Sequence, residues 1–137
     1  MRLSGVKVLV VDDNPDCLEG AAEWLQMEGA LVLTAASGNQ GFATFVREPP
    51  HIILSDICMP DGDGYDLIAR VRQLTPNNGG LTPAIAMSCA GNRERALRAG
   101  FQVFVAKPFD LLSVIEMITE LATKTPSPAS PAILPPP

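Results

Sequence analysis

The sequence predicts an α/β protein with a doubly wound parallel sheet, in which each of five strands is followed by a helix. Short, continuous apolar runs alternate with longer segments whose apolar residues recur at helical spacing, and such runs are typical of strands that are buried on both faces. Charged residues directly follow three of the runs, at the strand ends where open parallel sheets bind their ligands. These observations predict both the architecture and the edge of the sheet at which a functional site lies.

The first unit of this alternation begins with a strand expected over residues 6–11. Asn14 can cap the helix that follows, and Pro15 suits the first helical position. Small and apolar residues at i, i+3, i+4 and i+7 then mark one buried helical face, namely Leu18, Ala21, Ala22 and Leu25. Gly29 is placed to end this helix.

The same alternation continues through the rest of the chain. Further strands are expected at residues 30–35, 51–55, 83–87 and 101–105. The helices that follow them are expected at residues 38–47, 65–74, 92–99 and 110–122. Ser37 and Gln40 match a capping box at the start of the second helix, and Gly100 is placed to end the fourth. Prolines and glycines mark loops at residues 56–64 and 75–81.

Right-handed connections between the strands favour the order 2-1-3-4-5, which places the first and third strands side by side. Asp12 and Asp13 follow the first strand, Asp56 follows the third, and Lys107 follows the fifth. Like charges so close together resist joint ionisation unless a cation joins them, and oxygen ligands without a histidine suit Mg²⁺. The sequence therefore predicts a site for a metal ion and a phosphoryl group at this edge.

Composition limits the class of protein. A chain of 137 residues with 47% apolar residues is long enough for one domain with a substantial core. The net charge of -5 argues against binding nucleic acid by neutralising its backbone. No segment is long and apolar enough to span a membrane, and the first apolar run is broken at Asp12, unlike a signal peptide. We therefore expect a cytoplasmic protein.

Cysteine usage and the end of the chain support this interpretation. Cys17, Cys58 and Cys89 are odd in number and lack the spacing of a metal finger, which is typical of reduced thiols. The last residues are rich in proline and cannot form a helix or a sheet ladder. We expect one domain over residues 1–123 and an extended, disordered tail over residues 124–137.

Five short motifs, each near the end of an expected strand, resemble those of a known family. They are Val8-Leu9-Val10-Val11-Asp12-Asp13, Ser55-Asp56-Ile57-Cys58-Met59-Pro60, Asp63-Gly64-Tyr65, the run from Pro83 through Ser88 to Ala90, and Phe104-Val105-Ala106-Lys107-Pro108-Phe109. Together they resemble the receiver domain of two-component response regulators, and the resemblance covers residues 6–121. It implies a flavodoxin-like (βα)₅ fold and a phosphoacceptor signalling role rather than an enzyme that turns over a substrate.

The resemblance implies a role for each residue at the site. Asp56 is expected to take a phosphoryl group from a phosphohistidine of a histidine kinase or phosphotransfer protein. Asp13, Asp56 and the backbone carbonyl of Cys58 are expected to ligate Mg²⁺ directly, while Asp12 acts through a bound water. His51 is the one histidine of the chain and lies at the opposite strand end, so the donor histidine must belong to another protein or domain.

Further roles concern the response to phosphorylation. The resemblance implies that Lys107 pairs with Asp56 at rest and with the phosphoryl group afterwards, and that Pro108 follows a cis peptide. Ser88 is expected to bond the phosphoryl group, and Phe104 occupies an aromatic switch position. The expected output surface is the fourth helix, fifth strand and fifth helix, binding a downstream partner or a second receiver. An arginine cluster on the fourth helix favours an acidic partner: Arg93, Arg95 and Arg98.

Other interpretations stay open at this point. Asp12 and Asp13 also suit a helix N-terminus through the macrodipole, and Phe104 is equally well explained as an inert core residue. A haloacid-dehalogenase-type phosphatase also uses aspartate, Mg²⁺ and lysine, but it needs an Asp-x-Asp pattern where this chain has adjacent acids. A receiver-like module that is never phosphorylated is a third possibility. Two segments also look similar to receivers at the end of hybrid histidine kinases, around residues 3–12 and 79–83.

Overall fold

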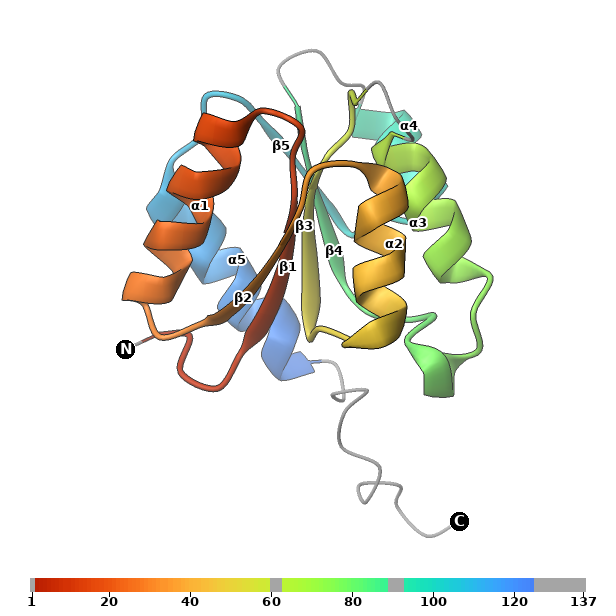
Figure 1. The fold of residues 1–137 in the computed structure, drawn as a ribbon, viewed down its shortest axis with the longest axis horizontal. Coiled ribbons are helices and arrows are strands. Elements are labelled where there is room, and N and C mark those ends of the chain that lie inside the picture. The colour runs from red at the N-terminus through yellow and green to blue at the C-terminus, as the bar shows by residue number, and fades with distance from the viewer. Residues whose placement is uncertain (1, 60–62, 89–92, 125–137) are drawn as a thin grey trace, which may run out of the picture.

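Five parallel strands form the centre of the molecule, and helices cover both faces of the sheet (Figure 1). A computed structural model describes residues 2–59, 63–88 and 93–124. The strands are β1 (Lys7–Val11), β2 (Leu31–Ala35), β3 (Ile52–Asp56), β4 (Ala84–Ser88) and β5 (Val103–Ala106). The helices are α1 (Pro15–Met27), α2 (Gly38–Arg47), α3 (Gly64–Arg72), α4 (Arg93–Ala99) and α5 (Leu111–Lys124), with a 3₁₀ turn at Pro76–Asn78. The strand order β2-β1-β3-β4-β5 confirms the predicted fold class.

The strands separate two hydrophobic cores, because successive side chains point to opposite faces of a sheet. Leu9 and Val11 pack with α2, α3 and α4 on one face, whereas Val8 and Val10 pack with α1 and α5 on the other. These four side chains have no measurable solvent exposure. Burial on both faces explains why the strands read as continuous apolar runs rather than as alternating patterns.

The helix boundaries follow from local capping. Asn14 accepts hydrogen bonds from the backbone N–H groups of Asp16 and Cys17, and Ser37 Oγ accepts one from Gln40 at 3.1 Å. In return the Gln40 side chain accepts from the N–H of Ala36, at 2.9 Å. The Asn14 and Ser37 contacts satisfy N–H groups that the first turn of a helix leaves without an intrahelical partner, and the Gln40 contact fixes the residue before the cap.

Several element bounds differ from the sequence prediction. β3 and β4 each extend one residue further, to Asp56 and Ser88, because the parallel ladder pairs Asp56 with Met87 and Ser88 with Ala106. α5 continues to Lys124, one residue past the expected domain boundary. The first proline after the helix is Pro126, and a proline disfavours helical backbone angles only at the residue directly before it, here Thr125. The Pro-rich segment expected as a disordered tail lies, from residue 125 on, outside the described residues. Within the described part of the chain, no helix has the length and apolarity needed to cross a membrane.

His51 ties the start of β3 to β1 at the edge of the sheet opposite the predicted site. The ring Nδ1 of His51 accepts a hydrogen bond from the backbone N–H of Lys7 at 2.8 Å, and the backbone N–H of His51 donates to the Lys7 carbonyl at 2.8 Å. Burial, and then the positive charge of Lys7, lower the pKa of His51. The neutral imidazole is therefore the form that the folded state favours.

Because the folded pKa of His51 lies below the unfolded one, the unfolded state binds a proton first as the pH falls. The stability that neutral His51 contributes is present above the unfolded pKa and is lost as the pH falls through the folded pKa. Urea unfolding between about pH 7.5 and about pH 5 should show a larger loss of stability for wild type than for His51→Asn, whose amide oxygen accepts without titrating. Equal losses in the two proteins would contradict this assignment.

Candidate functional site

The site is assembled from four strand ends at the carboxyl edge of the sheet. Asp12 directly follows β1, Asp56 and Ser88 are the last residues of β3 and β4, and Lys107 directly follows β5. Val11 pairs with Ser55 in the ladder, so Asp12 lies next to Asp56. The N–H of Lys107 donates to the Ser88 carbonyl at 2.9 Å, which holds the end of β5 against β4. The fold thus brings together residues that are up to 95 positions apart.

A single ammonium group links the two buried carboxylates. Lys107 Nζ lies 2.9 Å from Asp12 Oδ2 and 3.3 Å from Asp56 Oδ2. The expected pairing with Asp56 is present, but the shorter contact is with Asp12, which is 1% exposed. Burial alone lowers the pKa of Lys107, yet the contacts with Asp12 and Asp56 outweigh burial and raise it. Lys107 is therefore held firmly in its charged form.

Asp56 lies in surroundings that resist its negative charge. Burial is the largest cause that raises its pKa, and the charge of Asp12 adds to it. Lys107 and the N–H of Cys58, which donates to Asp56 Oδ1 at 3.3 Å, act in the opposite direction without cancelling the shift. A second cation at this point would relieve the remaining electrostatic cost.

The three carboxylates form one cluster. Asp12, Asp13 and Asp56 each offer an oxygen within 4.8 Å of the other two, and Asp13 is exposed. Both oxygens of Asp12 already accept protein donors, from the N–H of Asn14 at 2.9 Å and from Lys107. Hard carboxylate oxygens are the ligands that suit Mg²⁺, so the residues present fit this ion.

Ser88 and Phe104, the two expected switch residues, are both nearly buried. Ser88 is 1% exposed, and its Oγ lies 3.8 Å from the Sγ of the exposed Cys58. Phe104 is 8% exposed and belongs to the core under α2, α3 and α4. Ala90 and Cys89, which follow Ser88 in the motif, lie outside the described residues.

The arginine cluster predicted on the fourth helix is exposed on α4, and two of its three members also lie over aromatic rings. The Arg93 guanidinium lies 5.8 Å from the centre of the Phe104 ring, and that of Arg95 lies 4.0 Å from the centre of the Tyr65 ring. Two of the three expected arginines therefore stack on aromatic rings. The rings belong to β5 and α3, which sequence spacing along α4 alone does not reveal.

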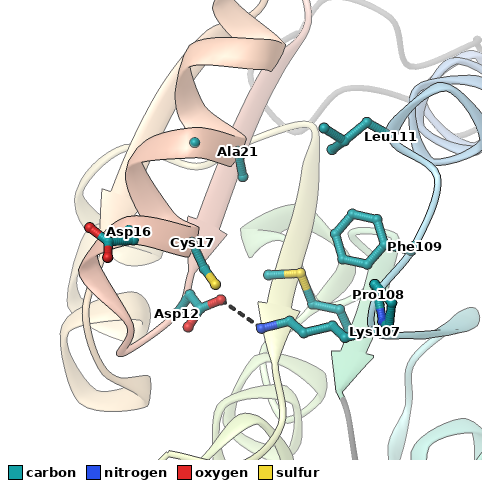
Figure 2. Close-up of a pocket in the computed structure, with 10 residues that line it drawn as sticks. Asp12, Asp16, Cys17, Ala21, Lys107, Pro108, Phe109 and Leu111 are labelled. Carbon is teal, nitrogen blue, oxygen red and sulfur yellow. Dashed lines mark hydrogen bonds and ion pairs between the residues drawn. The ribbon is translucent and has the colours of Figure 1, made fainter.

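Sequence reasoning missed two features beside the site. A Cβ at Gly64 would overlap the carbonyl oxygen of Asp56, so the Asp-Gly-Tyr motif contains a glycine because α3 starts against the backbone of β3. The second feature is a pocket of about 470 Å³ that opens beside Asp12 and Lys107 (Figure 2). Its mainly apolar wall is formed by Gly20, Ala21, Met87, Pro108, Phe109 and Leu111, with Asp16 and Cys17 also lining it.

The peptide bond between Lys107 and Pro108 is cis, as predicted.

The fold and the site together define a receiver-like α/β module with two buried aspartates, Asp12 and Asp56, at its centre. Comparison with known proteins agrees: the family model described as "Response regulator receiver domain" matches residues 8–119. The chain belongs to this family, and hence to the proteins of two-component signalling. The family is a phosphoacceptor signalling module rather than an enzyme in the usual sense.

Individual relatives cover different shares of their own length. The chain is 37% identical over 121 residues to a Leptolyngbya boryana protein named "Uncharacterized 14.6 kDa protein in sodA1 3'region", covering 86% of this chain and 91% of that protein. It is 32% identical over 122 residues to the Mycobacterium tuberculosis protein named "Probable transcriptional regulatory protein TcrX", covering 88% of this chain and only 51% of the relative. The chain thus spans about half the length of that regulator.

Solved structures show the same fold. A CheY-like response regulator receiver domain protein from Methanospirillum hungatei superimposes with a TM-score of 0.79 at 27% identity, covering 90% of this chain and 96% of that one. The receiver domain of Francisella response regulator 1452 superimposes with a TM-score of 0.81 at 23% identity, covering 89% of this chain and 100% of the other. Receiver domains generally bind Mg²⁺ and interact with histidine kinases and downstream effectors.

The charges at the site predict how Mg²⁺ binding should change the thermal stability of the protein. Because burial raises the pKa of Asp56, ionisation of this carboxyl group costs folding stability, and Asp56→Asn should raise the melting temperature of the metal-free protein. Mg²⁺ should stabilise wild type by about 2.7 kcal/mol at one hundred times its Kd, and Asp56→Asn far less. Asp13→Asn should weaken Mg²⁺ binding more than Asp12→Asn, since both Asp12 oxygens already have protein donors.

Thermal unfolding with and without MgCl₂ measures these effects, and isothermal titration gives the affinities. NaCl at matched ionic strength is the control for screening. If Mg²⁺ stabilised Asp56→Asn as much as wild type, the ion would bind somewhere other than at Asp56, and the prediction would be wrong.

Proposed function

We propose that the protein is a phosphoacceptor signalling domain in which Asp56 takes a phosphoryl group from a phosphohistidine of a partner kinase or phosphotransfer protein. The observation that carries this proposal is the Lys107 ammonium between Asp12 and Asp56, in a cluster whose carboxylate oxygens lie within 4.8 Å of each other. An aspartate that is buried, close to a second carboxylate and within reach of a lysine is placed for electrostatic control of a transferred anion.

The proposed step is a substitution at phosphorus. An Asp56 carboxylate oxygen forms the new P–O bond, the P–N bond to the donor imidazole breaks, and the bonding electrons leave with that nitrogen. Such transfers need positioning and charge neutralisation more than covalent assistance. Lys107 lies within 3.3 Å of Asp56 Oδ2, so its ammonium is placed to contact the phosphoryl oxygens that Asp56 acquires.

Asp13 and Asp56, with the backbone carbonyl of Cys58, would hold Mg²⁺, while Asp12 would contact it through water. When bound, this ion supplies positive charge that offsets the repulsion between the carboxylates and an incoming phosphoryl group. Ser88 Oγ is the hydroxyl proposed to bond the phosphoryl group, from the end of the neighbouring strand β4. These groups come from the ends of three neighbouring strands, β1, β3 and β4, so the proposed site depends on this sheet order.

Membership in the receiver family removes the reason to prefer a phosphatase of the haloacid-dehalogenase type. A receiver-like interaction module that is never phosphorylated is the remaining competitor. The three carboxylates offer oxygens within 4.8 Å of one another, and Lys107 contacts Asp12 and Asp56, which favours phosphorylation over that alternative.

Phosphorylation itself is directly testable. Incubation with Mg²⁺ and acetyl phosphate or phosphoramidate should add one phosphoryl group, because Asp56 is the acceptor in this proposal, and intact-protein mass spectrometry measures it. Asp56→Asn should abolish the mass increase, since an amide oxygen is a far weaker nucleophile. Chelation of Mg²⁺ by EDTA should also prevent the reaction.

Asp66→Asn is a matched control, because Asp66 is an exposed carboxylate in the first turn of α3. This variant should accept phosphate as wild type does. Modification that persists in Asp56→Asn, or that ignores EDTA, would contradict the assignment of the acceptor.

The proposed output surface consists of α4, β5 and α5, which binds a downstream partner or a second receiver. A phosphoryl group adds about -1.5 to -2 charges and new acceptor oxygens, and Ser88 and Lys107 reach them by moving the ends of β4 and β5. Phe104 lies in β5, under Arg93 of α4, so a displaced ring changes the contact that α4 makes. The outcome is a two-state equilibrium that phosphate biases.

The switch has a spectroscopic test. Beryllofluoride with Mg²⁺ mimics the phosphorylated carboxylate, and amide chemical shifts should change at Ser88, Phe104 and Arg93 as well as at the Asp56 loop. The Arg93 side-chain Nε resonance should also move, because its stacking partner is Phe104. Changes confined to Ile57 and Cys58 would leave Phe104 an inert core residue.

A further inference from the structure

Arg72, the last residue of α3, uses every donor of its guanidinium. Nε and Nη2 donate to the Gly100 carbonyl at 3.1 and 2.8 Å, Nη1 donates to the carbonyls of Gly80 and Thr82 at 2.9 and 2.7 Å, and Nη2 also donates to Gln102 Oε1 at 3.1 Å. A guanidinium has five N–H groups, so none remains for water. Burial lowers the pKa of Arg72, consistent with protein oxygens replacing its hydration shell.

These acceptors belong to segments that are far apart along the chain. Gly80 and Thr82 precede β4, Gly100 follows α4, and Gln102 precedes β5. Gln102 extends the link, since its Oε1 also accepts the N–H of Ala84 at 2.7 Å and its own N–H donates to the Ala84 carbonyl at 2.9 Å. Arg72 therefore joins the end of α3, the start of β4 and the exit of α4.

The exit of α4 is fixed in one conformation. Gly100 has a φ of +126°, its N–H donates to Leu97 O at 3.2 Å, and the N–H of Phe101 donates to Ala96 O at 3.1 Å. This is the Schellman pattern of a glycine-terminated helix. A Cβ at Gly100 would lie 3.0 Å from Arg72 Cγ, so the backbone rests directly against the arginine stem.

Few side chains of α4 are buried. Ala96 is its one buried side chain among seven residues. Arg93 and Arg95 contact Phe104 and Tyr65 through exposed guanidinium groups, and stacking of this kind is weak where water reaches the charge. The hydrogen bonds of the half-buried Arg72 come from a charged group and are therefore stronger than bonds between neutral groups. The hydrogen bonds from Arg72 to the Gly100 carbonyl therefore fix the C-terminal end of α4.

We propose that Arg72 is a positioning residue that anchors the C-terminal end of α4, so that the switch turns this helix about Gly100. The proposal rests on the phosphoacceptor function above and adds where the output surface changes. Ser88 and Phe104 act on the N-terminal side of α4, while Gly100 stays fixed to Arg72. Displacement then grows from Ala99 toward Arg93, and a partner protein that distinguishes the two states contacts the N-terminal half of α4.

Arg72→Lys tests the anchor without a phosphoryl mimic, because it keeps the charge and loses the planar fork. Amide hydrogen exchange at Gly100, Phe101 and Gln102 should become on the order of tenfold faster, while amides between β1 and β3 keep the wild-type rate. Arg70→Lys is the matched control: Arg70 lies on the same helix, stacks on Phe42 and bonds Asn39. It should leave those three amides unchanged.

Beryllofluoride with Mg²⁺ then tests the pivot. In wild type, amide shift changes should be large at Arg93–Arg95 and small at Gly100–Gln102. In Arg72→Lys, the changes should extend to Gly100–Gln102, so that the ratio between the two ends of α4 falls toward one. If Arg72→Lys does not fold, Gln102→Met serves instead, since it removes one acceptor of Arg72 and should shift both measurements in the same direction.

Each outcome is informative. Unchanged exchange at Gly100 and Phe101 in the variant would overturn the anchor, and equal shift changes at both ends of α4 in wild type would overturn the pivot. A lack of any response at Ile57 and Cys58 in wild type would instead overturn the phosphoacceptor function and the pivot with it. The exchange experiment would still decide whether Arg72 holds the end of α4.

Discussion

The attraction between one ammonium and two buried carboxylates is the interaction on which the site depends. Asp12 and Asp56 are 1% and 8% exposed, and without Lys107 their charges would face each other with the backbone N–H groups of Asn14 and Cys58 left to offset burial. Each group comes from a different strand, so the arrangement exists only when β1 lies beside β3 and the sheet continues through β4 to β5. The electrostatics of this edge therefore depend on the topology, and a change in strand order would separate these three groups while leaving every sequence motif intact.

Much of the fold was predictable because its signals are local. The run from Val8 to Val11 is apolar at every position, since alternate side chains enter two different cores. Asn14, Ser37 and Gly100 mark helix ends through backbone hydrogen bonds that short-range sequence determines. Once five strands and their connections were assigned, the right-handed crossovers allowed few strand orders. In the order observed, Asp12, Asp56 and Lys107 all lie at the carboxyl edge of the sheet.

Other features were not predictable, because they depend on distances between elements. The preference of Lys107 for Asp12 over Asp56 is a difference of 0.4 Å, from 2.9 to 3.3 Å, which packing decides. From the sequence alone, Arg93 and Arg95 are recognisable as part of a charged helix face. Their contacts with the rings of Phe104 and Tyr65 follow from tertiary packing. The pocket beside Lys107 likewise exists because α1 presents small side chains toward the loop that leads into α5. Motif recognition carries no signal for such geometry.

The two-sided burial of the strands has a consequence for how this domain can diverge. Inserting one residue into β1 would send Val8 and Val10 to the opposite core and move Asp12 away from Lys107, so length within the strands is fixed by both layers at once. The connections that enter the strands lie on the far rim, where His51 and Lys7 meet, remote from the carboxylates. An insertion in a connection on that rim would leave Asp12, Asp56 and Lys107 in place, whereas an insertion within a strand would not.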